Sequence, residues 1–74
     1  MLQLQARREE RGWTRAELAR RAGLNPTTVG AIESGRLQPY DKQLVKLAHA
    51  LKIPARSAAT LIQEVGESGA PTSR

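Results

Sequence analysis

The chain has 74 residues, of which 39% are hydrophobic and only two, Trp13 and Tyr40, are aromatic, so it is long enough for one domain with a small aliphatic core. The absence of cysteine excludes a disulfide-stapled scaffold and a thiolate metal site, and no apolar run approaches the roughly 20 residues that span a bilayer. The formal net charge of +5 favours a polyanionic partner, above all nucleic acid.

The positive charge is concentrated in residues 1–56, which carry eleven Lys and Arg against five Asp and Glu. Residues 57–74 carry one arginine against two glutamates. Such a surplus is typical of a nucleic-acid-binding surface, but it is equally typical of surface charge that keeps a small protein in solution. Charge alone therefore favours neither interpretation.

Start and stop signals for helices recur along the chain, whereas strand signals are lacking. Residues 2–11 favour a first helix. Thr14 and Glu17 form a capping-box pattern, in which each side chain accepts a hydrogen bond from the other residue's backbone N–H. This pattern predicts a second helix over about 15–22, with Gly23 as the residue that ends it.

Asn25 followed by Pro26 predicts the start of a third helix over about 26–33, because asparagine is a strong N-cap and proline is favoured at the first helical position. Leucines at helical spacing predict a fourth helix over about 41–51. Apolar residues at similar spacing predict a fifth helix over about 55–64.

These elements add up to an all-α fold, a compact bundle of about five short helices. We assign residues 1–65 to a single domain, and we expect residues 66–74, which are polar and rich in small residues, to be a flexible C-terminal tail. The architecture alone implies no function, because unrelated functions share the same folds.

Residues 15–34 contain a run of apolar and small side chains at the spacing of two crossing helices, with a glycine at the turn between them. These residues are Leu18, Ala19, Ala22, Gly23, Leu24, Val29 and Ile32. Together with residues 33–35 and with Pro39 before the fourth helix, they resemble the helix-turn-helix of the Xre/Cro/lambdoid-repressor family over about residues 4–62. The resemblance implies a lambda-repressor-like DNA-binding domain whose recognition helix is residues 26–33.

The resemblance also implies an ion pair. Arg8 matches the first-helix arginine of the family, and Glu33 matches its acidic partner after the recognition helix. We expect the pair to hold the first helix to the third, the alternative being two separate exposed charges. If the pair is buried, removal of one partner costs about 3–5 kcal/mol, because the other charge is left without a partner.

In such domains the second helix of the motif lies in the major groove, and its N-terminal residues meet the base edges. The base-contact candidates that the resemblance implies are Pro26, Thr27, Thr28, Gly30 and Ala31. The candidates for phosphate contacts lie at the ends of the motif helices and just beyond them: Thr14, Arg15, Asn25, Ser34, Arg36 and Lys42.

The expected recognition helix departs from the many family members that carry Gln, Arg or Asn there. Thr27 and Thr28 offer single hydrogen bonds or methyl contacts, so we expect a soft readout that includes DNA shape. Gly30 costs about 1 kcal/mol in a helix interior. It either permits close approach of the backbone to DNA or is merely tolerated.

We therefore expect a sequence-specific regulator of transcription that binds double-stranded DNA, a repressor acting as a homodimer on a two-fold operator. Leu61, Ile62 and Val65 are the candidates for the dimer contact, or they close the core of their own chain. An alternative function on the same fold is a protein-interaction module, such as an antitoxin or a bridging factor, with a protein partner and weak DNA binding.

Catalysis, cofactors and metal ions are not expected. The sequence has no P-loop motif, and His49 is a lone histidine without neighbouring ligands. No small-molecule ligand and no membrane contact are indicated. We expect a cytoplasmic protein that is associated with the nucleoid when it is bound to DNA.

Overall fold

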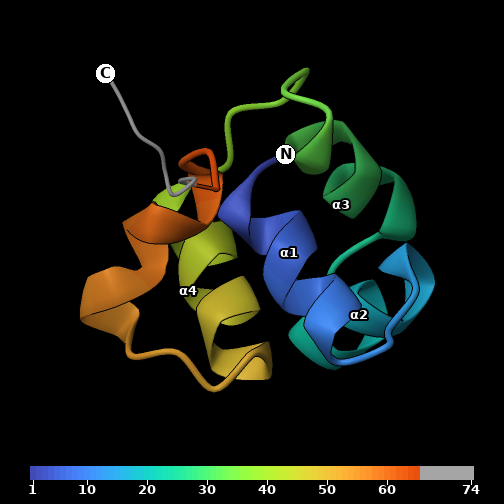
Figure 1. Cartoon of the computed structure of the whole chain (residues 1–74), viewed down its shortest axis with the longest axis horizontal. Coiled ribbons are helices and arrows are strands. Elements are labelled where there is room, and N and C mark those ends of the chain that lie inside the picture. Colours follow the sequence, from blue (N-terminus) through green and yellow to red (C-terminus); the bar gives the residue numbers. More distant parts are fainter. Residues whose placement is uncertain (66–74) are drawn as a thin grey trace.

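The computed structural model describes residues 1–65 as four α-helices and one 3-10 helix. In chain order these are α1 (Gln3–Glu10), α2 (Arg15–Ala22), α3 (Pro26–Glu33), α4 (Asp41–Ala50) and the 3-10 helix η1 (Ala55–Ile62) (Figure 1). Extended pairing within the described residues is limited to one isolated bridge between Leu2 and Glu64. The predicted all-α bundle of about five short helices is confirmed.

The caps of α2 and α3 explain why these two helices begin and end as predicted. Thr14 Oγ1 accepts a hydrogen bond of 3.0 Å from the backbone N–H of Glu17, and Asn25 Oδ1 accepts one of 2.8 Å from the N–H of Thr27. Gly23 ends α2 with φ at +74°, in the left-handed region that glycine enters at little cost. The local signals in the sequence thus define both helices.

The Glu17 carboxylate differs from the capping-box prediction. Instead of accepting from the N–H of Thr14, it accepts from Arg20 Nη2 at 2.6 Å and from Arg21 Nε at 2.5 Å. The prediction of the return bond was wrong because a hydrogen bond between two charged groups is stronger than one to a neutral amide. The two arginines lower the pKa of Glu17.

The fifth element differs from the prediction in length and in kind. It is a 3-10 helix that ends at Ile62, and Gln63 is already extended, with φ at −91° and ψ at 152°. The chain then pairs with its own first residues, since Gln3 N donates to Gln63 O at 2.8 Å and Val65 N donates to Met1 O at 2.9 Å. These long-range hydrogen bonds replace those of a further helical turn.

The core is aliphatic and draws on every helix. The large side chains that are at most 1% exposed are Leu4, Leu18, Val29, Ile32, Leu47, Leu51 and Leu61. Each such side chain contributes about 1.5–3 kcal/mol of hydrophobic stabilisation. Trp13 is partly buried and packs at the edge of this core.

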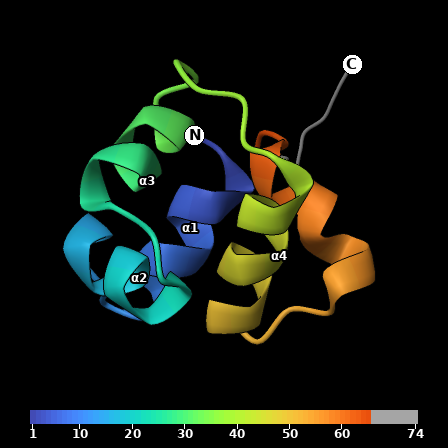
Figure 2. The same cartoon turned by 180° about the vertical axis from the view of Figure 1, so that it is seen from behind.

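The contacts between the helices place α3 and η1 on different sides of the molecule. α2 packs against both α3 and α4, while η1 packs against both α1 and α4. α3 therefore lies on one side of the molecule, and α4 and η1 lie on the other side, as the front view and the view from behind both show (Figures 1 and 2).

Candidate nucleic-acid interface

α2 and α3 form the predicted motif as two helices joined by a short turn. α2 ends at Gly23, and α3 follows Asn25 with Pro26 at its first position. The backbone N–H of Leu24 donates back to Ala19 O at 2.8 Å, which closes the turn onto the end of α2. The turn therefore holds α3 at a defined angle to α2.

α3 has a buried face and an outward face. Val29 and Ile32 turn into the core. The five base-contact candidates stay accessible, with Pro26 and Thr27 exposed and Thr28, Gly30 and Ala31 partly exposed. The outward face therefore consists of short side chains, which allow the backbone of the helix to lie deep in a groove.

Gly30 has room for a side chain inside its own molecule. A Cβ atom added there would meet Arg15 Cδ and Nη1 at 3.6 Å, which is an ordinary van der Waals distance. Glycine in a helix interior costs about 1 kcal/mol relative to alanine. Packing within the chain therefore does not require the glycine, and both alternatives from the sequence, close approach to DNA and mere tolerance, stay open.

Glu33, the last residue of α3, connects three helices. Its fully buried carboxylate accepts from Arg8 Nε at 2.7 Å, from Arg8 Nη2 at 3.1 Å and from Arg15 Nε at 3.1 Å. The structure thus brings together Arg8 and Glu33, and it adds Arg15 from the start of α2. A forked pair of this kind fixes orientation as well as distance.

Arg8 is almost fully buried on the α1 side of this cluster. Its Nη1 donates to the backbone carbonyl of Trp13 at 2.7 Å. The hydrogen bond from Arg8 to Glu33 raises the pKa of Arg8 above its usual value, although burial opposes this shift. The guanidinium therefore stays charged and ties α1 and the connection to α2 onto the end of α3.

Arg15 makes a contact with Glu33 that the sequence did not predict. It was expected to contact phosphate only, but it also crosses α3 beside Gly30 to reach Glu33. Its side chain remains 53% exposed. Because a guanidinium has five N–H donors, Arg15 keeps donors for a phosphate while Glu33 holds it in one orientation.

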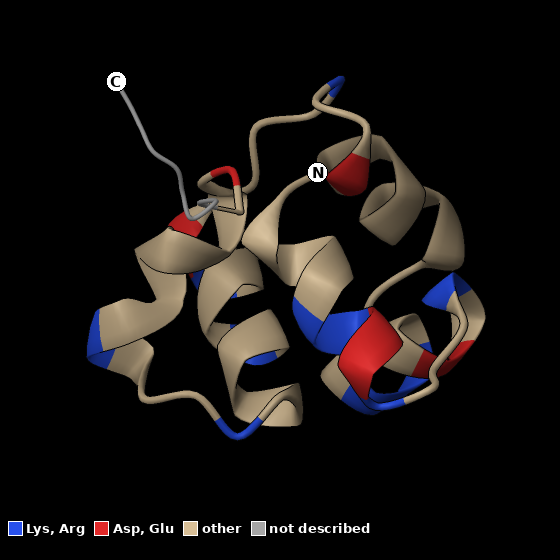
Figure 3. Cartoon of the chain, viewed as in Figure 1, with Lys and Arg blue, Asp and Glu red and all other residues tan. Residues whose placement is uncertain are grey.

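Ser34 and Arg36 lie together just after α3. Arg36 Nε donates to Ser34 Oγ at 3.0 Å, and Ser34 Oγ donates to Ala31 O at 3.0 Å. Basic residues thus occur at the start of α2, with Arg15, and in the loop after α3 (Figure 3).

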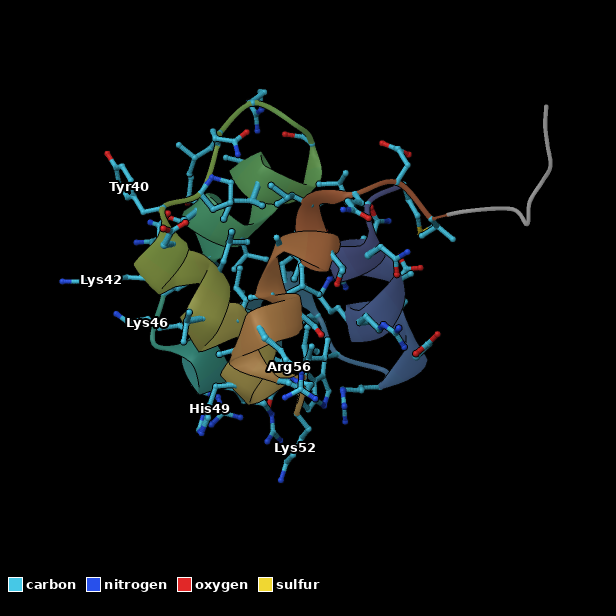
Figure 4. The ribbon with its side chains drawn as sticks, turned by 90° about the vertical axis from the view of Figure 1, so that its left-hand side faces the viewer. Tyr40, Lys42, Lys46, His49, Lys52 and Arg56 are labelled. Carbon is cyan, nitrogen blue, oxygen red and sulfur yellow. The ribbon has the colours of Figure 1, made fainter. Side chains whose placement is uncertain are left out.

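The remaining phosphate-contact candidates are Thr14, Asn25 and Lys42. Thr14 and Asn25 use their side-chain oxygens as helix caps, so they offer only the nearby backbone N–H groups to an anion. Lys42 is exposed in the first turn of α4 and points outward on the side shown in Figure 4.

The His, Asp and Glu side chains of residues 1–65 do not cluster as metal ligands. No group of three or more His, Asp or Glu side chains in that part of the chain comes together as a metal site. His49 is exposed on α4 (Figure 4). None of the helices described is long and apolar enough to cross a membrane.

The fold and the accessible face of α3, with Arg15 and Arg36 near its C-terminal end, define a helix-turn-helix domain. Residues 4–56 match the model of the helix-turn-helix family, and the chain belongs to this family. It is similar to the HTH-type transcriptional repressor RghR of Bacillus subtilis (strain 168), with 42% identity over 73 residues that cover 93% of this chain and 54% of the relative. The chain thus spans about half the length of that curated relative. No solved structure gives a significant match.

Proposed function

We propose that the protein is a transcriptional repressor that binds double-stranded DNA sequence-specifically and inserts α3 into the major groove. The observation that carries this proposal is the outward face of α3, which is lined by short side chains and has Arg15 and Arg36 near its C-terminal end. Membership in the helix-turn-helix family and similarity to a protein named as a transcriptional repressor support it. The proposal requires no cofactor and no catalytic group, and it implies action on the nucleoid in the cytoplasm.

The chemistry of α3 sets the kind of readout. Thr27 and Thr28 offer one hydroxyl and one methyl group each, and Ala31 offers a methyl group that suits the methyl group of thymine. Each mismatched base pair should therefore cost an amount at the low end of about 1–3 kcal/mol. DNA shape contributes the rest of the specificity.

We further propose that two protomers bind a two-fold operator whose half-sites are about one helical turn apart. Of the three dimer-contact candidates, Leu61 is fully buried in the core of its own chain, the alternative that the sequence left open. Ile62 is partly buried and Val65 is 36% exposed. These two residues remain the candidates for the contact between protomers.

Selection of bound duplexes from a random pool tests the proposal. The expected result is an enriched two-fold sequence motif with half-sites about one turn apart. Weak, salt-sensitive binding to all sequences without enrichment would contradict it.

Two single variants separate base contacts from phosphate contacts. Thr27→Val keeps the shape of the side chain but removes its hydroxyl, so it should change the preference at one base position and leave binding to random DNA intact. Arg36→Gln should weaken binding to all sequences and reduce the slope of log affinity against log salt by about 0.9, the value for one phosphate. The opposite pattern would show that the two residues have been assigned the wrong roles.

The rival interpretation, a protein-interaction module, rested partly on the apolar fifth helix. Ala58 and Leu61 of η1 are buried in the chain's own core, so this helix has less apolar surface for a partner than the sequence suggested. Binding of a protein that survives Arg36→Gln and depends little on salt would nevertheless favour that module over the repressor.

A further inference from the structure

Five basic or potentially basic side chains gather on the side of the molecule formed by α4 and η1. They are Lys42, Lys46, His49, Lys52 and Arg56, all exposed, and together they are called the α4–η1 basic face (Figure 4). The first three are four and three residues apart on α4, so they follow one side of the helix over about 10 Å. Lys52 lies just beyond the end of α4, and Arg56 lies at the start of η1 (Figure 4).

The charges of this face are not neutralised within the described chain. Among residues 1–65, no carboxylate lies within 4.0 Å of the charged groups of Lys42, Lys46, Lys52 or Arg56. α4 contains a single acid, Asp41, which lies exposed at its first position. The face therefore presents four cationic groups to solvent, with one acid beside Lys42.

Lys52 occupies a backbone position that does not suit lysine. Its φ is +62°, whereas the three other positive-φ positions of the described chain are glycines: Gly12, Gly23 and Gly35. It ends α4 in the manner of a glycine cap, since the next residue, Ile53, donates to Ala48 O at 2.8 Å. A lysine in this conformation is strained relative to glycine, and such an outlier points to a role for the side chain.

A polar hollow adjoins the face at Lys52. It has a volume of about 470 Å³ and lies between α1 and η1. Its lining includes Lys52, the Ser57 hydroxyl and Arg7, which also pairs with Glu10, so two cations and a hydroxyl group meet on a concave surface. Such groups suit an oxyanion, because hydroxyls donate hydrogen bonds and the cations add charge.

We infer that the α4–η1 basic face is a second binding surface for the phosphate backbone of double-stranded DNA, without sequence preference and separate from the surface of α2 and α3. The two surfaces lie on different sides of the molecule (Figure 1). One protomer can thereby hold a specific site through α3 and a second duplex segment through α4 and η1.

The composition of the face favours DNA over a protein partner. Lysine is depleted at protein–protein interfaces, where Tyr, Trp, Met and Arg are enriched. The face carries three lysines in a row along α4 and its C-terminal end, and a lysine is a point charge that accepts a phosphate from many directions. Several such charges on one surface suit the densely charged phosphate backbone of a duplex.

The double variant Lys46→Gln, Lys52→Gln tests the inference. Binding to a short labelled duplex of random sequence is measured by fluorescence anisotropy over a series of salt concentrations. The expected result is that the slope of log affinity against log salt becomes shallower by about 1.8, since each phosphate contact contributes about 0.9. An immobilised protein–DNA complex should also capture less of a second, free duplex.

The matched control is Arg20→Gln, Arg21→Gln, which removes the same formal charge from side chains that are paired with Glu17. Circular dichroism confirms that both variants are folded. A slope that changes equally in both variants, or in neither, would overturn the inference. Tight binding of polyglutamate that only the Lys46→Gln, Lys52→Gln variant loses, with an unchanged DNA slope, would also overturn it and assign the face to an acidic protein.

The salt titration and the selection of duplexes from a random pool together separate a failure of the second surface from a failure of the proposed repressor function. If the selected DNA motif is still preferred but the slope is unchanged, the second surface fails and the repressor stands. If no motif is enriched but the slope falls by the expected amount, the repressor fails and the second surface stands.

Discussion

Residues 1–35 and residues 36–65 carry similar positive charge but use it differently. The first region has six arginines and four glutamates, a net charge of +2, and the second has two arginines and three lysines against two acids, a net charge of +3. In the first region five arginines pair with glutamates: Arg7, Arg8, Arg15, Arg20 and Arg21. In the second region Lys42, Lys46, Lys52 and Arg56 face solvent without a carboxylate from residues 1–65 nearby.

The difference teaches that charge count does not predict the role of a charge. A guanidinium that is buried against a carboxylate, as Arg8 is against Glu33, serves the fold, and its loss leaves an unpaired charge in the core. An exposed ammonium such as that of Lys46 contributes little to stability and keeps its charge available for a partner. Four substitutions probe this distinction.

The largest effect is expected for Glu33→Gln. The substitution preserves the shape of the side chain but leaves Arg8 buried without its countercharge, which should lower the free energy of unfolding by about 3–5 kcal/mol. Urea denaturation measures the loss. The control is Lys46→Gln, which should stay within about 0.5 kcal/mol of the parent protein. Equal effects of the two substitutions would remove the distinction between the regions.

Gly30→Ala should have an effect of opposite sign. Because the added methyl group meets only Arg15, at 3.6 Å, the fold should become more stable by about 1 kcal/mol, the difference in helix propensity. DNA binding should nevertheless weaken if the backbone of α3 approaches the groove closely. Thermal unfolding and duplex affinity are measured on the same sample, and a variant that gains stability without losing affinity would show that the glycine is merely tolerated.

Lys52→Gly compares stability with DNA binding in the second region, as Gly30→Ala does in the first. Glycine relieves the left-handed strain, a gain of about 1 kcal/mol, and the lost attraction between the lysine charge and the carbonyl end of α4 offsets part of it. The variant should be at least as stable as the parent protein but should bind random duplex DNA with a shallower salt dependence. A clear loss of stability would indicate that the lysine serves the helix end instead.

The smallest effect concerns the pH dependence of stability. Hydrogen bonds from Arg20 and Arg21 lower the pKa of Glu17 in the folded protein. The stabilisation is therefore complete above the unfolded value, near 4.3, and is lost as the pH falls through the folded pKa. Glu17→Gln should make thermal unfolding slightly less sensitive to acid. Identical acid profiles would show that these exposed pairs contribute nothing measurable.

The sequence predicted those parts of the fold whose causes are local. Thr14, Gly23 and Asn25 act within a few residues of their own positions, so the bounds of α2 and α3 follow from them directly. The pairing of Gln3 with Gln63 depends on residues from opposite ends of the domain, and no periodic pattern in the sequence predicts it. The end of η1 was therefore misplaced.

In the candidate site, too, contacts between residues far apart in the sequence were harder to predict than local ones. The resemblance to a known family implied Arg8 and Glu33, but the arrival of Arg15 at Glu33 depends on the crossing of α2 over α3 beside a residue without a side chain. The left-handed backbone at Lys52 was also unpredictable, because the usual sign of that conformation is a glycine. The tail predicted at 66–74 lies outside the described residues.

The bridge between the first and last described residues has a consequence for native-state hydrogen exchange. It joins residues from opposite ends of the described chain, and loop-closure entropy opposes such a contact more than it opposes the local turn between α2 and α3. The amide hydrogens of Gln3 and Val65 should therefore exchange through a partial opening that leaves the helix-turn-helix folded. The amide of Leu24, in the turn, should exchange only when the whole domain unfolds, so the ends of the molecule open and close while the surface of α3 keeps its shape.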